Sequence, residues 1–425
     1  MHREPFRFLH AAALRLDHQL CGVGSVPEKV REIVEEASLI AFERVIEACL
    51  EHDVDFLLLA GDSFDAGDAG LRGPMALARG FQRLAEHEIA TCVVAGPHDP
   101  WSSWLSGIHY PELVHRLRPG ANTPTMIDCP TSPLAAVYGV YSRTRHDEVK
   151  THRAEGVAPD GRYAIGLASV ALDEPTLARW DTPDGLPALI EPTMNYWALG
   201  GGVARRTVHL NSGLLHDPAA PQGFSAAEAG PRGCTLVEVD AGGAANLTFL
   251  PTAPVRWERV YVNGGGESID QQSLVSLMRS ALAAIERFAT DDVWLVDWII
   301  GNLGTAGRRM AEPEFRRETL DAVHRDLELG DISVHTHRVS FANEGLASEP
   351  EGQTRGLMAQ FATGLAAKFA VPDRALHDIL ADSELRGGPW EGRIRDLLPE
   401  LDVQEIAGAA QREGCTWFAD LKEAA

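Results

Sequence analysis

The fold is decided by the stretch Leu57-Leu58-Leu59-Ala60-Gly61-Asp62-Ser63-Phe64-Asp65, in which an apolar run ends in a glycine turn that carries two carboxylates. A second apolar run, Cys92-Val93-Val94-Ala95, leads into Gly96-Pro97-His98-Asp99 in the same way. Continuous apolar runs of this length are typical of buried parallel strands. Because α/β enzymes place their chemistry at the carboxyl ends of such strands, we expect both turns at one functional edge of a sheet.

The composition limits the class of protein. A chain of 425 residues with ordinary apolar content is long enough for two or three domains. The net charge of -23 disfavours attraction to nucleic acid and to anionic membranes, so weak or no nucleic-acid binding is expected. The six cysteines form no C-x-x-C pair, which argues against a zinc ribbon or a disulfide framework. No run is long enough to span a bilayer, and a cytoplasmic location is expected.

Alternating short apolar runs and helical periods predict an α/β domain from residue 6 to about residue 239. Besides the strands already named, the patterns predict a strand at 6–11 and a long amphipathic helix from about residue 28 to residue 48. A further helix is predicted at 72–87. Further strands are predicted at 134–140, 163–167, 196–199 and 235–239.

A boundary is predicted near Pro251 to Pro254, followed by a smaller α/β unit. Its pattern is a strand at 256–262, a helix at 273–288, a strand at 293–300 and a helix at 314–327. A linker at 343–353 precedes a segment whose pattern is mostly helical from Gly356 onward. The predicted domains are therefore residues 1–253, 254–342 and a helical tail at 354–425.

The order and spacing of several motifs resemble the calcineurin-like metallophosphoesterases, specifically a YhaO-like branch of DNA-repair exonucleases. The resemblance is carried by Phe8-Leu9-His10-Ala11-Ala12, by residues 54–65, by Gly96-Pro97-His98-Asp99, by Tyr196-Trp197-Ala198-Leu199-Gly200 and by residues 230–240. It implies an αββα sandwich for the first domain. A small α/β accessory domain and a helical tail also fit what that branch implies.

The resemblance implies a two-metal site, but this sequence departs from the family's ligand motifs. The family uses an Asp-x-His, a Gly-Asp-x-x-Asp, a Gly-Asn-His-Asp, a later His and a Gly-His-x-His to hold two divalent ions that generate a hydroxide nucleophile. Asp62 is retained. The positions where ligands are lost are Ala13, Arg15, Pro97, Ser169, Gly201 and Val203.

Divalent cations need about four to six donor atoms, so one shared carboxylate does not make a site, and no cofactor is expected. The guanidinium of Arg15 would repel a cation. We hypothesise that Arg15 instead reaches Asp62, with Asp65 or Asp99 as a further partner, in a charge-assisted pair. Arg15, Asp62 and Asp65 are accordingly predicted to be structural.

The sequence therefore predicts a catalytically inactive pseudo-nuclease that acts as a binding or scaffolding subunit. One alternative is a phosphoesterase with a remodelled site around Asp62, Asp65, His98 and Asp99, which would use two Mn ions; His98 and Asp99 are the residual catalytic candidates. Another is a non-cleaving DNA-end or phosphate-binding module that uses Arg15, Arg205 and Arg206.

The resemblance also implies partners. Active relatives pair with SMC-like coiled-coil ATPases and often dimerise, so such an ATPase and a homodimer are expectations here. The helical tail is the first choice for a docking surface, because amphipathic helices fit apolar grooves. A basic cluster at Arg143, Arg145, His146, Lys150, His152 and Arg153 is more typical of a solvated surface than of a phosphate grip.

Overall fold

The computed structural model describes residues 4–24, 26–66, 70–104, 107–117, 124–129, 132–140, 161–172, 194–210, 213–264, 269–301, 309–310, 312–325 and 329–341. The chain divides into a unit of Met1–Ala342 and a unit of Asn343–Ala425. The predicted linker at 343–353 and helical tail at 354–425 lie outside the described residues, as does the basic cluster at 143–153. None of the described helices is long and apolar enough to cross a membrane.

The first sheet has six strands in the order β12-β11-β1-β2-β3-β4. Strands β1 to β4 pair in parallel, whereas β11 and β12 add to the β1 side in antiparallel pairing. The run Leu57 to Ala60 forms β2, and all of its residues are buried. The bounds are β1 Phe6–Ala12, β2 Phe56–Ala60, β3 Ala90–Val94, β4 Val114–Arg116, β11 Gly233–Val239 and β12 Ala245–Pro251.

The second sheet also has six strands, in the order β5-β6-β7-β8-β10-β9. Its centre, β6 to β8 with β10, is parallel, and β5 and β9 are antiparallel edge strands. The bounds are β5 Thr125–Asp128, β6 Pro133–Val140, β7 Tyr163–Ala168, β8 Tyr196–Leu199, β9 Arg206–Leu210 and β10 Gly213–Asp217.

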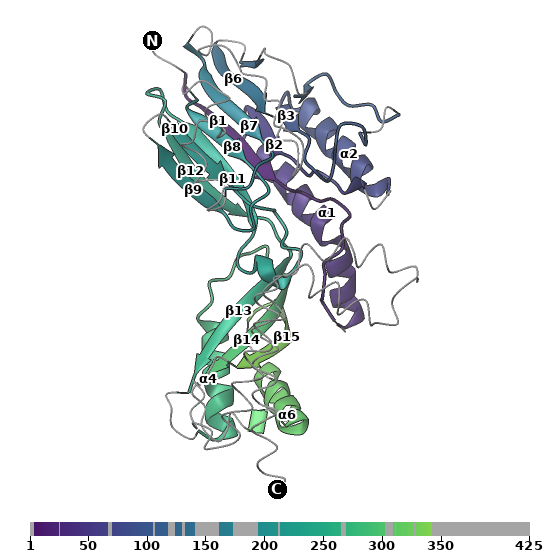
Figure 1. Ribbon diagram of the computed structural model, residues 1–425, viewed down its shortest axis with the longest axis vertical. Coiled ribbons are helices and arrows are strands. Elements are labelled where there is room, and N and C mark those ends of the chain that lie inside the picture. Colours follow the sequence, from purple (N-terminus) through teal and green to yellow (C-terminus); the bar gives the residue numbers. More distant parts are fainter. Residues whose placement is uncertain are drawn as a thin grey trace, which may run out of the picture. The chain divides into compact units, whose positions relative to one another are not determined.

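The two sheets pack face to face over one apolar core. Phe6 and Phe8 from the first sheet contact Tyr163 and Tyr196 from the second. The other face of the first sheet is covered by α1 (Glu28–Glu51) and α2 (Arg72–Glu86), as Figure 1 shows. The predicted α/β sandwich is confirmed, and its architecture brings the carboxyl ends of the parallel strands of both sheets to one edge.

A third, smaller sheet follows the sandwich in the chain. Its strands β13 (Val255–Asn263), β14 (Val293–Gly301) and β15 (Ser333–Phe341) are all parallel. The helices α4 (Gln271–Ala283) and α6 (Pro313–His324) pack on one face through a core that includes Trp294, Trp298 and Met278. We call this unit the accessory sheet. Helix α4 begins with Asp270, whose side chain accepts a hydrogen bond from the Ser273 N–H.

The first strands of the accessory sheet also pack on the sandwich. Val255 and Trp257 share a buried cluster with Val34 of α1 and Phe224, which precedes the short 3₁₀ helix η4 (Ala226–Glu228). The Trp257 Nε1–H donates to the Gly223 carbonyl at 3.1 Å. The loop before η4 therefore links the accessory sheet to the functional edge of the sandwich.

Candidate functional site

The loops that follow β1 and β2 lie side by side at the carboxyl edge of the first sheet. The Ala13 N–H donates to the Gly61 carbonyl at 3.1 Å, and the Arg15 N–H donates to the Asp62 carbonyl at 2.8 Å. Ser169, which follows β7 in the second sheet, lies so close that a Cβ on Gly61 would be 2.1 Å from its Oγ. The structure thus brings Ala13, Arg15, Asp62 and Ser169 to one place.

Three of these residues have an unusual backbone conformation. Ala13, Arg15 and Asp62 have φ angles of 48°, 43° and 48°. A positive φ is uncommon outside glycine, and it persists only where the surrounding structure holds it. Such residues cluster at functional sites. The three positive φ angles therefore mark this edge of the sheet as the candidate functional site.

The Asp62 side chain is bound to its own loops. Its Oδ1 accepts a hydrogen bond from the His98 N–H at 2.9 Å, and the residue is 8% exposed. A Cβ on Gly96 would lie 2.1 Å from the same oxygen, so only glycine fits there. Asp62 consequently fixes the turn after β3 against the turn after β2.

Asp99 connects the same two turns through hydrogen bonds to their backbone N–H groups. Its carboxylate accepts hydrogen bonds from the N–H groups of Asp62 at 3.0 Å, Ser63 at 2.9 Å and Gly96 at 2.5 Å. Complete burial raises the pKa of Asp99 to about 7, although the N–H donors oppose this shift. Asp99 therefore orients the loop backbone rather than the His98 ring.

The expected ion pair of Arg15 is wrong. Among the described residues, no ion pair joins Arg15 to Asp62, Asp65 or Asp99. Its guanidinium instead lies 3.4 Å from His18 Nε2 and 5.0 Å from the centre of the Phe224 ring. The physical reason is that Asp62 and Asp99 are already satisfied by backbone N–H groups, whereas the Phe224 ring offers a cation–π contact.

Asp65 lies between two imidazoles. Its Oδ2 is 3.6 Å from His98 Nδ1 and 3.9 Å from His18 Nδ1. Because a guanidinium only donates, its contact at His18 Nε2 favours the tautomer with a proton on Nδ1. The His98 side chain is 42% exposed. Asp65 and His98 therefore form a partly exposed pair of titratable groups at this edge.

The loop after β8 carries the remaining lost-ligand positions. Gly201 has a φ of 111°, and Val203 is 59% exposed. A residue that the sequence did not single out, Asp217 at the end of β10, anchors this loop: its Oδ2 accepts from the Gly202 N–H at 2.9 Å. Burial raises the pKa of Asp217. Nothing in its sequence context marks it, because its role depends on backbone groups from distant loops.

The proposed phosphate-binding arginines have contacts of their own. The Arg205 guanidinium lies 3.9 Å from the centre of the Phe249 ring in β12. Burial lowers the pKa of Arg205. Arg206 opens the edge strand β9, opposite Asp217 in register. The two arginines therefore lie beside the loop after β8, where the edge strands of the two sheets meet.

Two histidines lie inside the sandwich rather than in the site. His10 Nδ1 is 3.0 Å from the Tyr196 hydroxyl, and the ring is fully buried. His216 lies between the hydroxyls of Thr207 and Thr235, each at 2.8 Å. Burial lowers the pKa of both, that of His216 to about 3. These imidazoles link the sheets to each other.

The donor set at this edge does not fit a two-metal centre. In the part of the chain that the structure describes, no three His, Cys, Asp or Glu side chains are grouped to hold a metal ion. Ala13, Gly201 and Val203 have no side-chain donor, and Arg15 carries a positive charge. Asp62 Oδ1 already accepts the His98 N–H. The described residues of this edge therefore do not supply the ligand set that the family's two-metal step uses.

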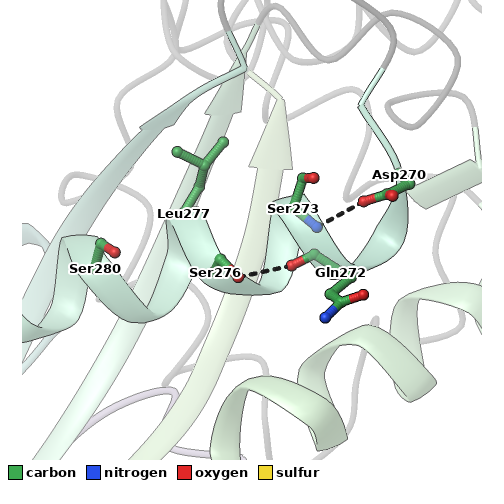
Figure 2. Close-up of a pocket in the computed structure, with 6 residues that line it drawn as sticks. All are labelled: Asp270, Gln272, Ser273, Ser276, Leu277 and Ser280. Carbon is green, nitrogen blue, oxygen red and sulfur yellow. Dashed lines mark hydrogen bonds between the residues drawn. The ribbon is translucent and has the colours of Figure 1, made fainter.

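Two pockets lie elsewhere on the described surface. One, of about 480 Å³, lies along α4 and is lined by small polar side chains around Leu277 (Figure 2). Its Ser276 hydroxyl donates to the Gln272 carbonyl of the same helix at 2.9 Å. The other, of about 570 Å³, lies at the opposite end of the first sheet beside Asp55 and Glu238. Neither includes a residue of the functional edge.

Comparison with known proteins gives a sequence relative. The chain is 28% identical over 259 residues to the uncharacterized metallophosphoesterase YhaO of Bacillus subtilis, and the match covers 60% of this chain. It spans 62% of the length of that relative. No family model matches the chain.

Two solved structures are similar in part. TT1561 of Thermus thermophilus is 13% identical with a TM-score of 0.33, covering 58% of this chain and 99% of that one. A dimetal phosphatase of Danio rerio is 10% identical with a TM-score of 0.34, covering 56% of this chain and 94% of that one. The sequence relative, the two-sheet sandwich and the glycine turns after β2 and β3 agree: the chain is similar to the metallophosphoesterases.

Proposed function

We propose that this chain is a pseudo-nuclease, a metallophosphoesterase that has lost two-metal catalysis and serves as a binding or scaffolding subunit. One observation carries the proposal: the retained carboxylates hold backbone N–H groups instead of facing an open site. Asp62 accepts from His98, and Asp99 accepts from three amides. Two-metal hydrolysis needs a ligand shell that positions both ions and the hydroxide between them, and these side chains do not supply one.

The finer assignments belong to the same proposal. We place the chain in the YhaO-like branch of DNA-repair exonucleases and in the cytoplasm. The partner that the resemblance implies is an SMC-like coiled-coil ATPase. The 28% identity to YhaO, an uncharacterized metallophosphoesterase, supports the YhaO-like part of this placement. A scaffolding role is consistent with an edge that retains the family's loop backbone but lacks side chains that could ligate metal at most of the family's ligand positions.

The proposal is tested by hydrolysis of bis(p-nitrophenyl) phosphate by the full chain in excess Mn²⁺. The matched variant is Asp62→Asn, because asparagine tolerates the positive φ of this position. We expect wild type and variant to give the same background rate as Mn²⁺ alone. Metal-dependent turnover by the wild type that Asp62→Asn abolishes would instead establish the remodelled enzyme around Asp62, Asp65, His98 and Asp99.

The phosphate-binding alternative has its own signature. Arg15, Arg205 and Arg206 supply three positive charges along the edge and the loop after β8. Binding through such groups weakens steeply with salt. A 5′-phosphorylated oligonucleotide whose affinity falls as NaCl rises, and falls again in Arg206→Gln, would favour that alternative over the scaffold.

A further inference from the structure

The described residues cover one face of the accessory sheet only in part. Sheets whose strands are all parallel are found almost only with both faces buried. Helices α4 and α6 cover one face. On the other face, the described residues that pack against the sandwich come from the first part of β13 and β14: Val255, Trp257, Val293 and Leu295 lie in a cluster with residues of the sandwich such as Phe224.

The second part of that face forms an ordered surface, which we call the open half-face. The strand register sets two rows across it. The first row is Arg259 of β13, Asp297 of β14 and Arg338 of β15. The second row is Tyr261, Ile299 and Ser340 in the same strand order. Tyr261 is 69% exposed, the largest value among the exposed apolar and aromatic side chains of the described residues.

The charge on the open half-face comes from its two arginines. Asp297 is 3% exposed, and its Oδ1 lies 2.5 Å from His337 Nδ1. The Arg338 side chain is 58% exposed and lies 3.5 Å from Asp297 Oδ2. Arg259 is exposed and donates through its NH2 group to the Ala226 carbonyl at 2.9 Å. Arg259 and Arg338 therefore lie on either side of Asp297, in the row next to Tyr261 and Ile299.

We propose that the open half-face is the docking site for an amphipathic helix of a partner protein, with an apolar stripe over Tyr261 and Ile299 and acidic residues opposite Arg259 and Arg338. Helices are the elements that cover parallel sheets, and arginine and tyrosine dominate the energetics of protein interfaces. Guanidinium groups bind carboxylates in paired hydrogen bonds. This docking site rests on the proposed role as a binding subunit and names the surface that performs it.

The charge of the chain favours a protein over nucleic acid as the occupant. The net charge of -23 repels a phosphate backbone, and the centre of the arginine row is a carboxylate. An amphipathic helix would bring a few carboxylates to the two arginines and would bury Tyr261. Unlike nucleic acid, it carries no continuous line of negative charge.

The test places a photo-crosslinking p-benzoylphenylalanine at position 261 in the full chain, expressed in its native cell. The control chain carries it at Leu277, which is 38% exposed on α4 across the sheet. The proposal predicts a 261-specific adduct with another protein, cross-linked through a helix with acidic residues beside an apolar stripe. An adduct with nucleic acid, with a second copy of this chain or with a non-helical or basic segment overturns it, as does no adduct above the Leu277 level.

The captured protein is then purified and titrated with variants of the full chain. Arg338→Glu is expected to weaken binding at least tenfold, and Tyr261→Ala about tenfold. Arg317→Glu, on the exposed face of α6, is expected to leave the affinity unchanged. Equal affinity for all variants would overturn the site. Mn²⁺-dependent hydrolysis, measured separately on wild type, would instead overturn only the pseudo-nuclease.

Discussion

Asp99 shows how single residues of the functional edge act as structural clamps. Its two carboxylate oxygens join the turns after β2 and β3 by accepting three backbone N–H bonds. Its pKa of about 7 lies above the value of about 3.9 for an unfolded aspartate. A raised folded-state pKa contributes stability that is present below the unfolded pKa and is lost as pH rises through the folded pKa.

Asp99→Asn is therefore expected to lower the free energy of unfolding by about 1–3 kcal/mol at acidic pH, because one amide oxygen cannot accept all three N–H groups. The difference in the free energy of unfolding between wild type and variant should become smaller as pH rises from 4 to 8, since only the wild type loses a proton at this position. Urea unfolding at several pH values measures both effects. The control, Asp240→Asn, alters an exposed turn aspartate and should show neither the loss of stability nor its dependence on pH. A stability difference for Asp99→Asn that grows with pH would contradict the raised pKa of Asp99.

Arg15→His tests whether one restored ligand is enough. Ala13, Ser169, Gly201 and Val203 would still give no metal shell. We expect calorimetry to detect no Mn²⁺ binding to the variant beyond that of wild type. Stoichiometric binding by Arg15→His alone would show that the edge holds more usable donors than Asp62, Asp65 and His98 supply.

At the scale of elements, buried imidazoles join the two sheets. His216 of β10 meets Thr235 of β11, and His10 of β1 meets Tyr196 of β8. The His216 pKa of about 3 lies below the value of about 6.5 for an unfolded histidine. The unfolded chain therefore takes up a proton first, so this stability is present above pH 6.5 and is lost as pH falls toward 3.

His216→Gln removes that titration and keeps groups that can hydrogen-bond to the two threonines. We expect the wild type to lose stability more steeply than the variant between pH 6.5 and 4, in chemical unfolding followed by circular dichroism. The exposed His209→Gln on β9 is the matched control and should follow the wild type. Parallel curves for wild type and His216→Gln would contradict a neutral buried His216.

The elements that the sequence predicted are those with continuous apolar runs or strong helical periods. Strands β2, β3, β7, β8, β11 and β14 were recognised for the first reason, and α1, α2, α4 and α6 for the second. The strands that were missed include β9 and β15, whose burial is partial along their whole length. Such strands form because of the neighbour they pair with: β9 pairs with the next strand, β10, and β15 pairs with β14, about thirty residues earlier in the chain.

The candidate site was likewise predictable only in part. The converging loop positions followed from the motifs, because parallel strands end at a common edge. The orientation of the Arg15 side chain could not be predicted from the motifs, since its contact Phe224 lies more than two hundred residues away in the chain. The loop anchor Asp217 was missed because its partners are backbone groups, which leave no pattern in the sequence.

At the scale of the whole molecule, Gln222 ties the accessory sheet to the sandwich. Its amide donates to the Val255 carbonyl at 2.7 Å, and its oxygen accepts from the Val255 N–H at 3.4 Å. Gln222→Met would leave these buried groups unpaired, at a cost of about 1–3 kcal/mol. We expect tryptophan fluorescence, in which Trp257, Trp294 and Trp298 of the accessory sheet are three of the nine tryptophans, to show an early transition before the main far-ultraviolet transition. Coincident transitions in the variant would contradict this coupling.

The proposed loss of two-metal catalysis is tested most directly by crystals of the protein soaked in excess manganese, with anomalous diffraction collected at the edge that carries Asp62. We expect no anomalous peak within coordination distance of the Asp62 carboxylate, which keeps its hydrogen bond to the His98 N–H. Two ordered manganese ions a few ångströms apart beside Asp62 would contradict it and would identify the residues that replaced the family's ligands.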